Sequence, residues 1–399
     1  MIPYSEARKL TLEQISSLEI ENVGIAQATG RVVAEDICAL VDSPNLDVSL
    51  KDGYAIKSAD ISSASPKTPV RLKLLGVISA GGSWDEEVVN GTAVRILSGA
   101  PIPRGAQAVV ADEFASDDRQ MVTVVNHSEQ GRNILPKSTD ISLGQRMVHA
   151  GKVLQPTMVG LLAAAGHSSI PVIKHPKVAI IATGDEVIAP GTTLSDGKLY
   201  ASNLVTLAAW CNHFGMATST LVVKDHEETI RSKLMECIDH HDAIITSGGA
   251  WKGDRDLVVR LLDELGWEKI YHRVRIGPGK AVGFGLYEGK PVFCLPGGPP
   301  SNHIAFLQLA LPGLQKLSGI TYSGLPTIPA RLEEGVRGQK DWTQFIHGLI
   351  EHSESNILFH PLKSASRLQM MAQAEGIISI PEGVDYIPEG SIVQVQLLA

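Results

Sequence analysis

The sequence predicts a multidomain fold: a doubly wound α/β domain, a β-rich module, a helical linker region and a small C-terminal β domain. The first observation behind this prediction is that residues 175–318 alternate apolar strand-like runs with helical segments, as a parallel sheet covered on both faces requires. The second is that residues 23–150 and 319–399 carry short β-like runs between Gly, Pro, Asn and Asp turns. A chain of 399 residues also exceeds what one hydrophobic core usually serves.

In the first half of the chain, one helix is predicted on each side of a β-like stretch. Apolar residues at helical spacing predict a helix over residues 5–18. A second helix is predicted over residues 154–165, where Pro156 fits the first turn because that position needs no backbone donor. Between the two helices we expect strands near residues 70–75, 92–97, 108–111 and 121–125.

In the second half, short apolar runs predict strands and longer periodic segments predict helices. Strands are expected at residues 178–182, 218–223, 242–246, 281–286 and 291–295. Helices are expected at residues 200–214, 226–239, 254–265 and 301–317. Beyond them, alternating runs at 377–380 and 391–397 indicate a separate β domain.

These patterns of predicted strands and helices indicate four domains. The linker domain comprises residues 1–40 and 136–174, because the β-rich module, residues 41–135, is inserted into it. The α/β domain comprises residues 175–318 and the C-terminal β domain residues 319–399.

Composition excludes several classes of protein. The net charge of −8 argues against a general grip on nucleic acid, which needs a basic face to displace counterions. The longest weakly polar stretch, residues 153–166, is shorter than the roughly 20 residues that cross a bilayer, and no signal-peptide core follows Met1, so we expect a cytoplasmic protein. The 4 cysteines form no C-x-x-C pair, which makes a zinc site or disulfide framework improbable, and Cys294 reads as a small core residue.

Small and acidic residues follow three of the predicted strands at the point where each strand ends. The first strand runs into Thr183-Gly184-Asp185-Glu186, the second into Ser247-Gly248-Gly249 and the third into Pro296-Gly297 and Ser301. Because the carboxyl ends of parallel strands meet at one edge of a sheet, where open α/β sheets bind ligands, the three loops predict a single site.

The third loop and a nearby lysine predict an oxyanion site. The loop precedes a predicted helix, whose first N–H groups would bind a phosphate or oxyanion, and Ser301 would cap that helix and donate to the anion. Lys280, after a Pro-Gly turn, would reach the same edge and neutralise the anion. The plain alternatives are an ordinary strand-to-helix turn and a solvated loop lysine.

Acidic residues beside a phosphate site predict a divalent cation, because two anions need a cation between them. Asp185 follows the first strand directly, and Asp254 and Asp256 follow the second at a short distance. We therefore predict these three as ligands of Mg²⁺. For Asp254 and Asp256 the alternative is capping of the next helix.

Seven short motifs stand in a fixed order along the chain. They are Asp52–Ala55, Ala93–Pro103, Gly160–Gly166, Val178–Glu186, Ser247–Gly249, Pro278–Lys280 and Leu295–Gly297. In this order they resemble the MoeA family, the molybdopterin molybdenumtransferases. Each motif alone is modest, but all of them together and in register identify the chain as a member of that family.

The resemblance implies an elongated homodimer whose α/β domain is similar to the adenylyltransferase MogA, which is also an implied partner. It implies Mg²⁺-dependent cleavage of adenylylated molybdopterin, transfer of molybdate to the dithiolene and release of AMP. It implies an active cleft between the α/β domain of one subunit and the β-rich module of the other. The partners are thus small molecules and a second subunit, with no nucleic acid and no membrane.

The resemblance also assigns roles to residues. Asp52 and Ser98 would enter the cleft from the partner subunit. Asp185, Asp256 and Lys280, with Asp52, would be the catalytic residues. The substrate would contact the three loops through Thr183, Gly184, Glu186, Ser247, Gly248, Gly249, Trp251, Lys252, Pro296, Gly297, Ser98 and Ser301.

Several positions depart from the family pattern at the implied site. Ala201 stands where the family carries an acid, Trp251 where it carries a serine, Gly277 where it carries a lysine and Gly298 where it carries an asparagine. Two interpretations follow. In the favoured one, the transferase has repositioned its charges: Lys252 or Arg275 holds the oxyanion, and Asp185, Asp254 or Asp256 replaces the lost acid.

In the other interpretation, the protein binds a molybdopterin, a nucleotide or a partner without turnover. The residues leave open whether molybdate or tungstate is the substrate, and what the C-terminal β domain does.

Overall fold

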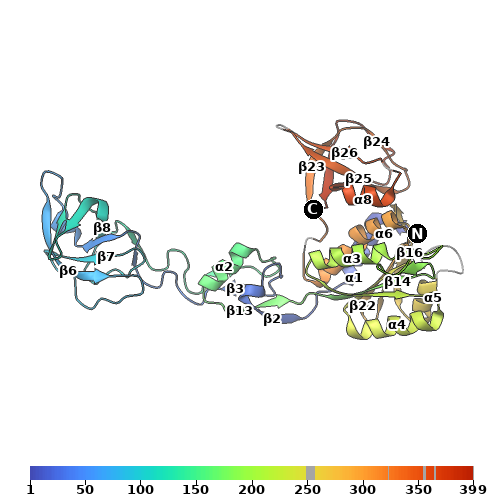
Figure 1. Cartoon of the computed structure of the whole chain (residues 1–399), viewed down its shortest axis with the longest axis horizontal. Helices are drawn as coiled ribbons and strands as arrows, with labels where there is room; N and C mark the ends of the chain where they lie inside the picture. The colour runs from blue at the N-terminus through green and yellow to red at the C-terminus, as the bar shows by residue number, and fades with distance from the viewer. Residues whose placement is uncertain (249–256, 322, 354–355, 364, 399) are drawn as a thin grey trace.

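The computed structural model describes every residue except 249–256, 322, 354–355, 364 and 399. The chain forms an elongated molecule (Figure 1), with a β-rich module at one end, a slender linker region in the middle, and the α/β domain and C-terminal β domain stacked at the other end. The predicted fold class is confirmed. The four domain boundaries stay a prediction.

The α/β domain is built on a six-stranded sheet in which β17, β14, β18 and β22 run parallel and β21 and β19 complete one edge antiparallel. Side chains of β14 alternate between two cores, with Val178 and Ile180 in one and Ala179 and Ile181 in the other. This burial of both faces explains the continuous apolar run of that strand. The strands, in sheet order, are β17 (Ala217–Val223), β14 (Lys177–Thr183), β18 (Ala243–Ser247), β22 (Lys290–Leu295), β21 (Gly283–Tyr287) and β19 (Glu268–His272).

Helices cover both faces of this sheet (Figure 1), as a doubly wound fold requires. The predicted helix over 301–317 is interrupted by a π-helical turn at Phe306–Ala310. The strand β19, Glu268–His272, was not predicted from the sequence, because its charged residues hide the β pattern. One face carries α1 (Tyr4–Gln14), α3 (Ser202–His213), α6 (Pro299–Ala305) and α7 (Leu311–Leu317); the other carries α4 (Glu227–His240) and α5 (Leu257–Leu265).

The β-rich module contains a six-stranded sheet, and each of the four strands predicted there is confirmed. Tyr54 and Ile56 lie fully buried in its core. In sheet order the strands are β8 (Ala108–Ala111), β5 (Gly53–Ile56), β7 (Thr92–Ile96), β6 (Val70–Ile78), β10 (Met121–Val124) and β9 (Ala115–Asp117), with short 3₁₀ turns at Ser58–Ile61 and Asp112–Phe114.

The chain passes through the linker region twice and forms two-stranded sheets there, beside the helix α2. Leu154, Leu162 and Ile170 form its small core. Among the described residues, no helix is long and apolar enough to cross a membrane. The elements are β2 (Ile20–Gly24) with β13 (Ser169–Ile173), β3 (Ile37–Cys38) with β12 (Arg146–Val148), β4 (Val48–Ser49) with β11 (Ile134–Leu135), a 3₁₀ turn at Ile25–Gln27, and α2 (Pro156–Ala164).

The C-terminal sheet has seven strands, two of which come from outside the C-terminal segment. β1 (Ile2–Pro3) and β20 (Val274–Gly277) extend it in the order β1-β20-β25. This continuity ties the sheet to the α/β domain. The other strands are β23 (Thr327–Leu332), β25 (Thr343–His352), β26 (Ile357–Pro361), β27 (Gly376–Ile380) and β29 (Ile392–Leu397), beside α8 (Arg367–Gln373) and the pair β24 (Val336–Arg337) and β28 (Tyr386–Ile387).

A buried pair of histidines joins the α/β domain to the C-terminal sheet. His303 of α6 and His347 of β25 stack with ring centroids 5.6 Å apart. Trp210 of α3 donates its indole N–H to Nε2 of His303 at 3.2 Å. Burial lowers the pKa of His303 to about 3 and that of His347 to about 4, so both are neutral at pH 7.

This pair predicts that stability falls in mild acid. In the unfolded chain both histidines bind protons below pH ~6.5, whereas in the folded protein they bind protons only near the lowered pKa values. Between these pKa values, the free energy of unfolding therefore falls by about 1 kcal/mol per histidine for each unit by which the pH is lowered. Urea unfolding between pH 7 and pH 5 measures the slope. His347→Gln should flatten it, and the matched control His149→Gln, at an exposed position, should not. An unchanged slope in His347→Gln would contradict this expectation.

Candidate functional site

The register of the parallel strands brings three loops to one edge of the sheet. Ala182 of β14 pairs with Ser247 of β18, and Ser247 pairs with Leu295 of β22. The backbone N–H of Gly248 donates to the carbonyl of Leu295 at 3.2 Å, so the second loop lies against the third. The structure therefore brings the three predicted strand ends together. We call this edge the strand-end rim and define it by Thr183, Ser247 and Leu295.

At the rim, Gly248 allows a backbone approach that no other residue would. Its φ is +105°, and a Cβ there would lie 2.5 Å from the carbonyl oxygen of Thr183. The hydroxyl of Thr183 is buried beside Gly248 and has no hydrogen-bond partner among the residues that the structure describes. A buried polar atom without a partner costs free energy unless a ligand or water pairs with it. The Thr183 hydroxyl thus marks the rim as a place that receives a polar group.

Two asparagine side chains from different helices meet at Ser247. Nδ2 of Asn302, in α6, donates to Oγ of Ser247 at 3.0 Å, and Nδ2 of Asn203, in α3, donates to the same atom at 3.3 Å. Each amide also donates to the third loop: Asn302 to the carbonyl of Pro296 at 2.9 Å, and Asn203 to that of Gly297 at 2.8 Å. These bonds tie the second and third loops into one unit.

The predicted capping role of Ser301 is wrong. α6 begins at Pro299, with Gly298 as its N-cap and no side-chain capping bond. Proline is favoured in the first turn of a helix because its missing N–H is not needed there, and the two prolines move the start ahead of Ser301. Ser301 instead lines the cavity described below.

Acidic side chains gather beside the first loop. A carboxylate oxygen of Asp185 accepts the backbone N–H of Asp225 at 3.3 Å, and the carboxylate of Glu186 folds back over Gly184. Burial raises the pKa of Asp225, and the charges of Asp185 and Glu186 raise it further. A cation placed among these groups would relieve that repulsion. Nζ of Lys198 donates to the backbone carbonyl of Asp185 at 2.7 Å.

The carboxylates of this acidic cluster fit Mg²⁺ only if water and substrate supply the other ligands. Within the described part of the chain, no group of three or more His, Cys, Asp or Glu side chains converges well enough to hold a metal ion. Mg²⁺ commonly takes one or two protein carboxylates and completes its shell with water and substrate phosphates. Asp185 with Asp225 or Glu186 satisfies that smaller requirement.

A cavity of about 820 Å³ opens between the third loop and the C-terminal domain. Of the residues that the structure describes, three cationic side chains line it: Lys280, Arg337 of β24 and Arg367 of α8. Nζ of Lys280 lies 5.9 Å from the ring centroid of Trp342, so an aromatic face backs the lysine. Its lining also includes Ser301, Gly297, Gly298, Pro296, Gly277, Gln344 and Phe345. We call this space the cationic cavity.

Arg275 does not line the cationic cavity, so it does not replace the missing lysine at Gly277. Its guanidinium forms an ion pair with Glu382 at 2.7 Å, because β20 joins the C-terminal sheet and turns the side chain toward that domain. Arg337 and Arg367 supply the positive charge instead.

Asp52 and Ser98 contact each other in the β-rich module. A carboxylate oxygen of Asp52 accepts the backbone N–H of Ser98 at 2.7 Å, and this bond lowers the pKa of the carboxyl group. The pair lies at the ends of β5 and β7, at the far end of the molecule from the strand-end rim (Figure 1). One chain therefore does not bring Asp52 and Ser98 to the other predicted site residues.

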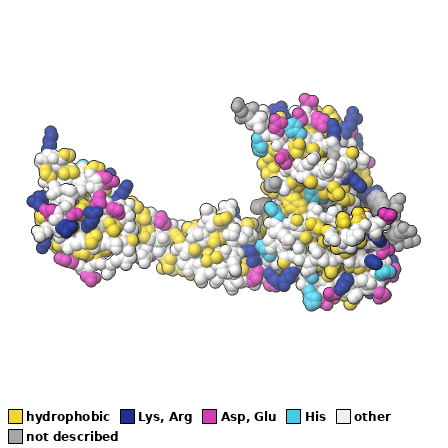
Figure 2. Space-filling view, in the orientation of Figure 1, with side chains coloured by type: hydrophobic (Ala, Val, Ile, Leu, Met, Phe, Trp, Pro, Cys, Tyr) yellow, Lys and Arg dark blue, Asp and Glu magenta, His cyan; other side chains and the backbone are white. Residues whose placement is uncertain are grey.

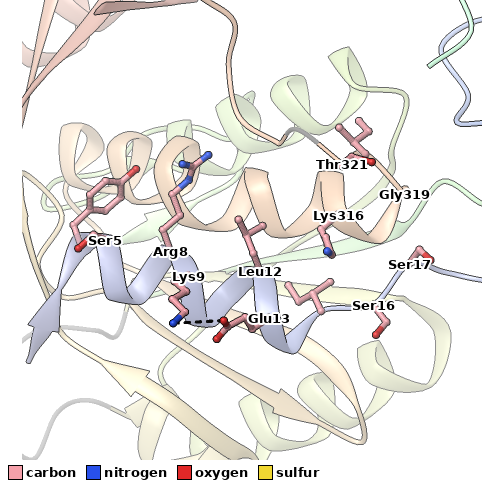
Figure 3. Close-up of a pocket in the computed structure, with 13 residues that line it drawn as sticks. Ser5, Arg8, Lys9, Leu12, Glu13, Ser16, Ser17, Lys316, Gly319 and Thr321 are labelled. Atoms are coloured by element: carbon pink, nitrogen blue, oxygen red, sulfur yellow. Dashed lines mark ion pairs between the residues drawn. The ribbon is translucent and has the colours of Figure 1, made fainter. Parts of the chain in front are cut away.

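A further cavity, of about 950 Å³, lies between α1 and the end of α7 (Figure 3). Arg8, Leu12 and Lys316 border it, and an ion pair between Lys9 and Glu13 spans 3.7 Å on α1. None of the predicted site residues lines this cavity. It offers matched control positions for substitutions in the cationic cavity.

The remaining predicted residues, Gly249, Trp251, Lys252, Asp254 and Asp256, lie outside the described residues.

Other elements bring further residues to the site that the sequence did not predict. Asp225 comes two residues after the end of β17, as Asp185 does after β14, and could have been found by the same signal. Asn203, Asn302, Arg337 and Arg367 carry no such signal, because only the tertiary fold brings them to the loops.

Three family models match the chain in the order of its domains. The first model, described as "MoeA N-terminal region (domain I and II)", matches residues 2–166. "Probable molybdopterin binding domain" covers residues 179–316, and "MoeA C-terminal region (domain IV)" covers residues 329–398.

Relatives match over the whole length. Molybdopterin molybdenumtransferase 2 of Mycobacterium tuberculosis is 30% identical over 401 residues, covering 99% of both chains. A molybdopterin molybdenumtransferase of Staphylococcus aureus is 29% identical, covering 99% of this chain and 95% of the relative. A crystal structure of a molybdopterin biosynthesis MoeA protein from Pyrococcus horikoshii superposes with a TM-score of 0.82 at 28% identity and covers 100% of both chains.

Proposed function

The chain belongs to the MoeA family of molybdopterin molybdenumtransferases, and from this premise we propose that it inserts molybdate into adenylylated molybdopterin, with release of AMP, in a Mg²⁺-dependent reaction. Its membership of this family makes the protein a transferase of molybdenum cofactor biosynthesis.

The observation that carries the proposal is the cationic cavity beside the strand-end rim. Lys280, Arg337 and Arg367 give it a positive charge that favours an oxyanion such as molybdate. Ser301 and the glycines of the third loop add a hydroxyl and close access to the backbone. These features support binding of molybdate next to the third loop.

The strand-end rim supports binding of the pterin or the nucleotide. Gly248 lets a ligand reach the backbone between the first and second loops, and Thr183 and Ser247 lie at neighbouring strand ends along this edge. Because Gly297 belongs to both the rim loops and the cavity lining, a dithiolene held at the rim would lie next to an oxyanion in the cavity. In this arrangement the chain's own part in the reaction is to bind and orient the two substrates and to offset the charge of the oxyanion.

Asp185, with Asp225 or Glu186, is proposed to hold Mg²⁺ together with a substrate phosphate. Bound there, Mg²⁺ would offset the charge between the carboxylates and the phosphate. Asp225 also supplies an acidic group near the first loop, which compensates for Ala201, a buried residue at the start of α3. Asp254 and Asp256 remain proposed ligands from the second loop.

Removing two of these carboxylates should weaken Mg²⁺-dependent binding of AMP. For the double variant Asp185→Ala/Asp256→Ala we expect at least a tenfold loss of affinity, about 1.4 kcal/mol, because the cation loses its protein ligands. Isothermal titration calorimetry with AMP, with and without Mg²⁺, measures the effect. Asp196→Ala, at an exposed position before β16 (Leu199–Tyr200), is the matched control. Binding equal to that of the parent protein would refute the metal site.

A homodimer is proposed to complete the site. Asp52 and Ser98 lie too far along the molecule to reach the rim of their own chain (Figure 1), and a second copy is the simplest source of them.

Large apolar side chains stay exposed around the linker region, and on the face that Figure 2 shows this section carries few charges. They include Leu40, Leu46, Leu50, Leu143 and Leu161. Such exposure supports a protein interface.

The test of the proposal is a turnover assay with purified protein, adenylylated molybdopterin, Mg²⁺ and molybdate, followed by chromatography of AMP. We expect AMP release that requires molybdate and Mg²⁺. If the protein binds AMP but does not cleave adenylylated molybdopterin to release it, the alternative is favoured, a binding protein without turnover. The departures from the family pattern at Ala201, Gly277 and Gly298 leave this alternative open. A MogA-like adenylyltransferase is the proposed supplier of the substrate, and replacing molybdate by tungstate identifies the preferred anion.

A further inference from the structure

The hydroxyl of Ser247 is held from two sides by amide donors. Asn203 and Asn302 both donate to its Oγ, at 3.3 Å and 3.0 Å. Ser247 and Asn302 are 5% and 2% exposed, so water does not compete freely for these bonds. A serine hydroxyl has two acceptor positions and one donor. The two amides therefore occupy both acceptor positions.

The orientation of each amide is determined by a second bond. Nδ2 of Asn302 also donates to the carbonyl of Pro296, and Nδ2 of Asn203 also donates to the carbonyl of Gly297. A backbone carbonyl accepts and never donates, so the group that faces it must be the NH₂ of each asparagine. A flipped amide would place two oxygens against each other. Both asparagines are thus fixed as donors to Ser247.

Ser247 is left with only its hydrogen to share. Among the described residues, this hydrogen has no acceptor in the protein. The hydroxyl of Thr183, at the neighbouring strand end, is buried and has no hydrogen-bond partner in the described part of the chain. Two hydroxyls at adjacent strand ends therefore have hydrogen-bonding capacity that the described residues do not use.

We propose that Asn203 and Asn302 are positioning residues that turn the Ser247 hydroxyl into an obligate donor toward the ligand at the strand-end rim. The chemistry that fits such a donor is an anionic or carbonyl oxygen, as on a phosphate or a pterin. That the ligand is adenylylated molybdopterin rests on the proposed function. The arrangement of the two asparagines around Ser247 does not.

The two donors can be tested without any ligand by replacing the hydroxyl with a thiol. Amide donors stabilise a thiolate, so the pKa of the thiol in Ser247→Cys should rise when a donor is removed. We expect the pKa to rise by about one unit or more in Ser247→Cys/Asn302→Leu. The measurement is a pH titration of the ultraviolet absorbance of the thiolate in a Cys38→Ser background. The other cysteines are buried, and burial raises the pKa of Cys211 to about 12.

Asn212→Leu is the control substitution, since Asn212 lies on α3, as Asn203 does, but pairs with Thr218. If Asn302→Leu does not fold, Asn203→Ala, at the start of α3, removes the other donor. A thiol that titrates at the same pH with and without the asparagines would overturn the proposal.

The second measurement is AMP affinity in a double-mutant cycle. Ser247→Ala and Asn203→Ala should each weaken binding by about tenfold, and Asn203→Ala should cost nothing more in the Ser247→Ala background, because it acts through that hydroxyl. Additive losses would mean a purely structural role and would overturn the proposal. If the parent protein binds no AMP, the proposed function fails while the thiol titration still decides the role of the asparagines. If AMP binds but the thiol pKa does not respond, the positioning role fails alone.

Discussion

Replacing Gly248 by alanine should reduce turnover by about 100-fold while leaving the protein folded. The new Cβ would lie 2.5 Å from the carbonyl oxygen of Thr183, a distance that forces the first and second loops apart. A displacement of about 1 Å in groups that position a substrate is enough for such a loss. The positive φ adds strain of about 1–3 kcal/mol, which lowers the melting temperature. The rate of AMP release, together with thermal unfolding, measures both effects.

Gly266→Ala separates the clash from the strain. Gly266 also has a positive φ, +85°, but a Cβ there would meet nothing within 4 Å, and it lies in the turn between α5 and β19. We expect the control to lose stability and keep its activity. If Gly248→Ala kept the activity of this control, the rim would not be the reaction site.

Reversing the charge of Lys280 should reduce activity by at least about 100-fold, with most of the effect on molybdate. Lys280→Glu places a carboxylate in the cationic cavity beside Arg337 and Arg367, where it would pair with them and repel the oxyanion. Loss of a single donor to a developing or bound oxyanion commonly costs about 100- to 1000-fold. The measurement is AMP release as a function of molybdate concentration.

Lys316→Glu is the matched control, because Lys316 lines the separate cavity beside α1 (Figure 3) and changes the net charge by the same amount. An equal loss in both variants would indicate a general electrostatic effect and would remove the cationic cavity from the site. Lys280→Arg should recover part of the activity, since it restores the charge.

The sheet and its rim were predictable from the sequence because local patterns encode them. The strands around Val178, Ile245 and Val292 are apolar on both faces, and each ends in small residues, so their shared edge follows from the parallel order alone. The helices follow from apolar spacing in the same way. The error at Ser301 arose because the prolines before it were read as a loop and not as the first turn of α6.

The cationic cavity was not predictable, since it is formed by contacts between distant segments. Arg337 and Arg367 approach Lys280 only because β20 leaves the α/β domain and pairs with β25. The same pairing turns Arg275 toward Glu382, against the expectation from its position in the sequence. The asparagines at Ser247 come from the first turns of two helices, where spacing gives no sign of a shared partner.

The most direct test of the account is to mix two inactive variants. In the proposed dimer, Asp52 enters each site from one subunit and Lys280 from the other, so Asp52→Ala and Lys280→Glu disable opposite halves of the site. In a mixed dimer, one of the two sites receives neither substitution. Random mixing in equal amounts should therefore restore AMP release to about one quarter of the parent rate.

The control is each variant denatured, refolded and assayed alone, which should stay inactive. Restored activity on mixing would establish a site shared between two copies of this chain. No recovery, with mixed dimers demonstrated by differently tagged subunits, would contradict the account.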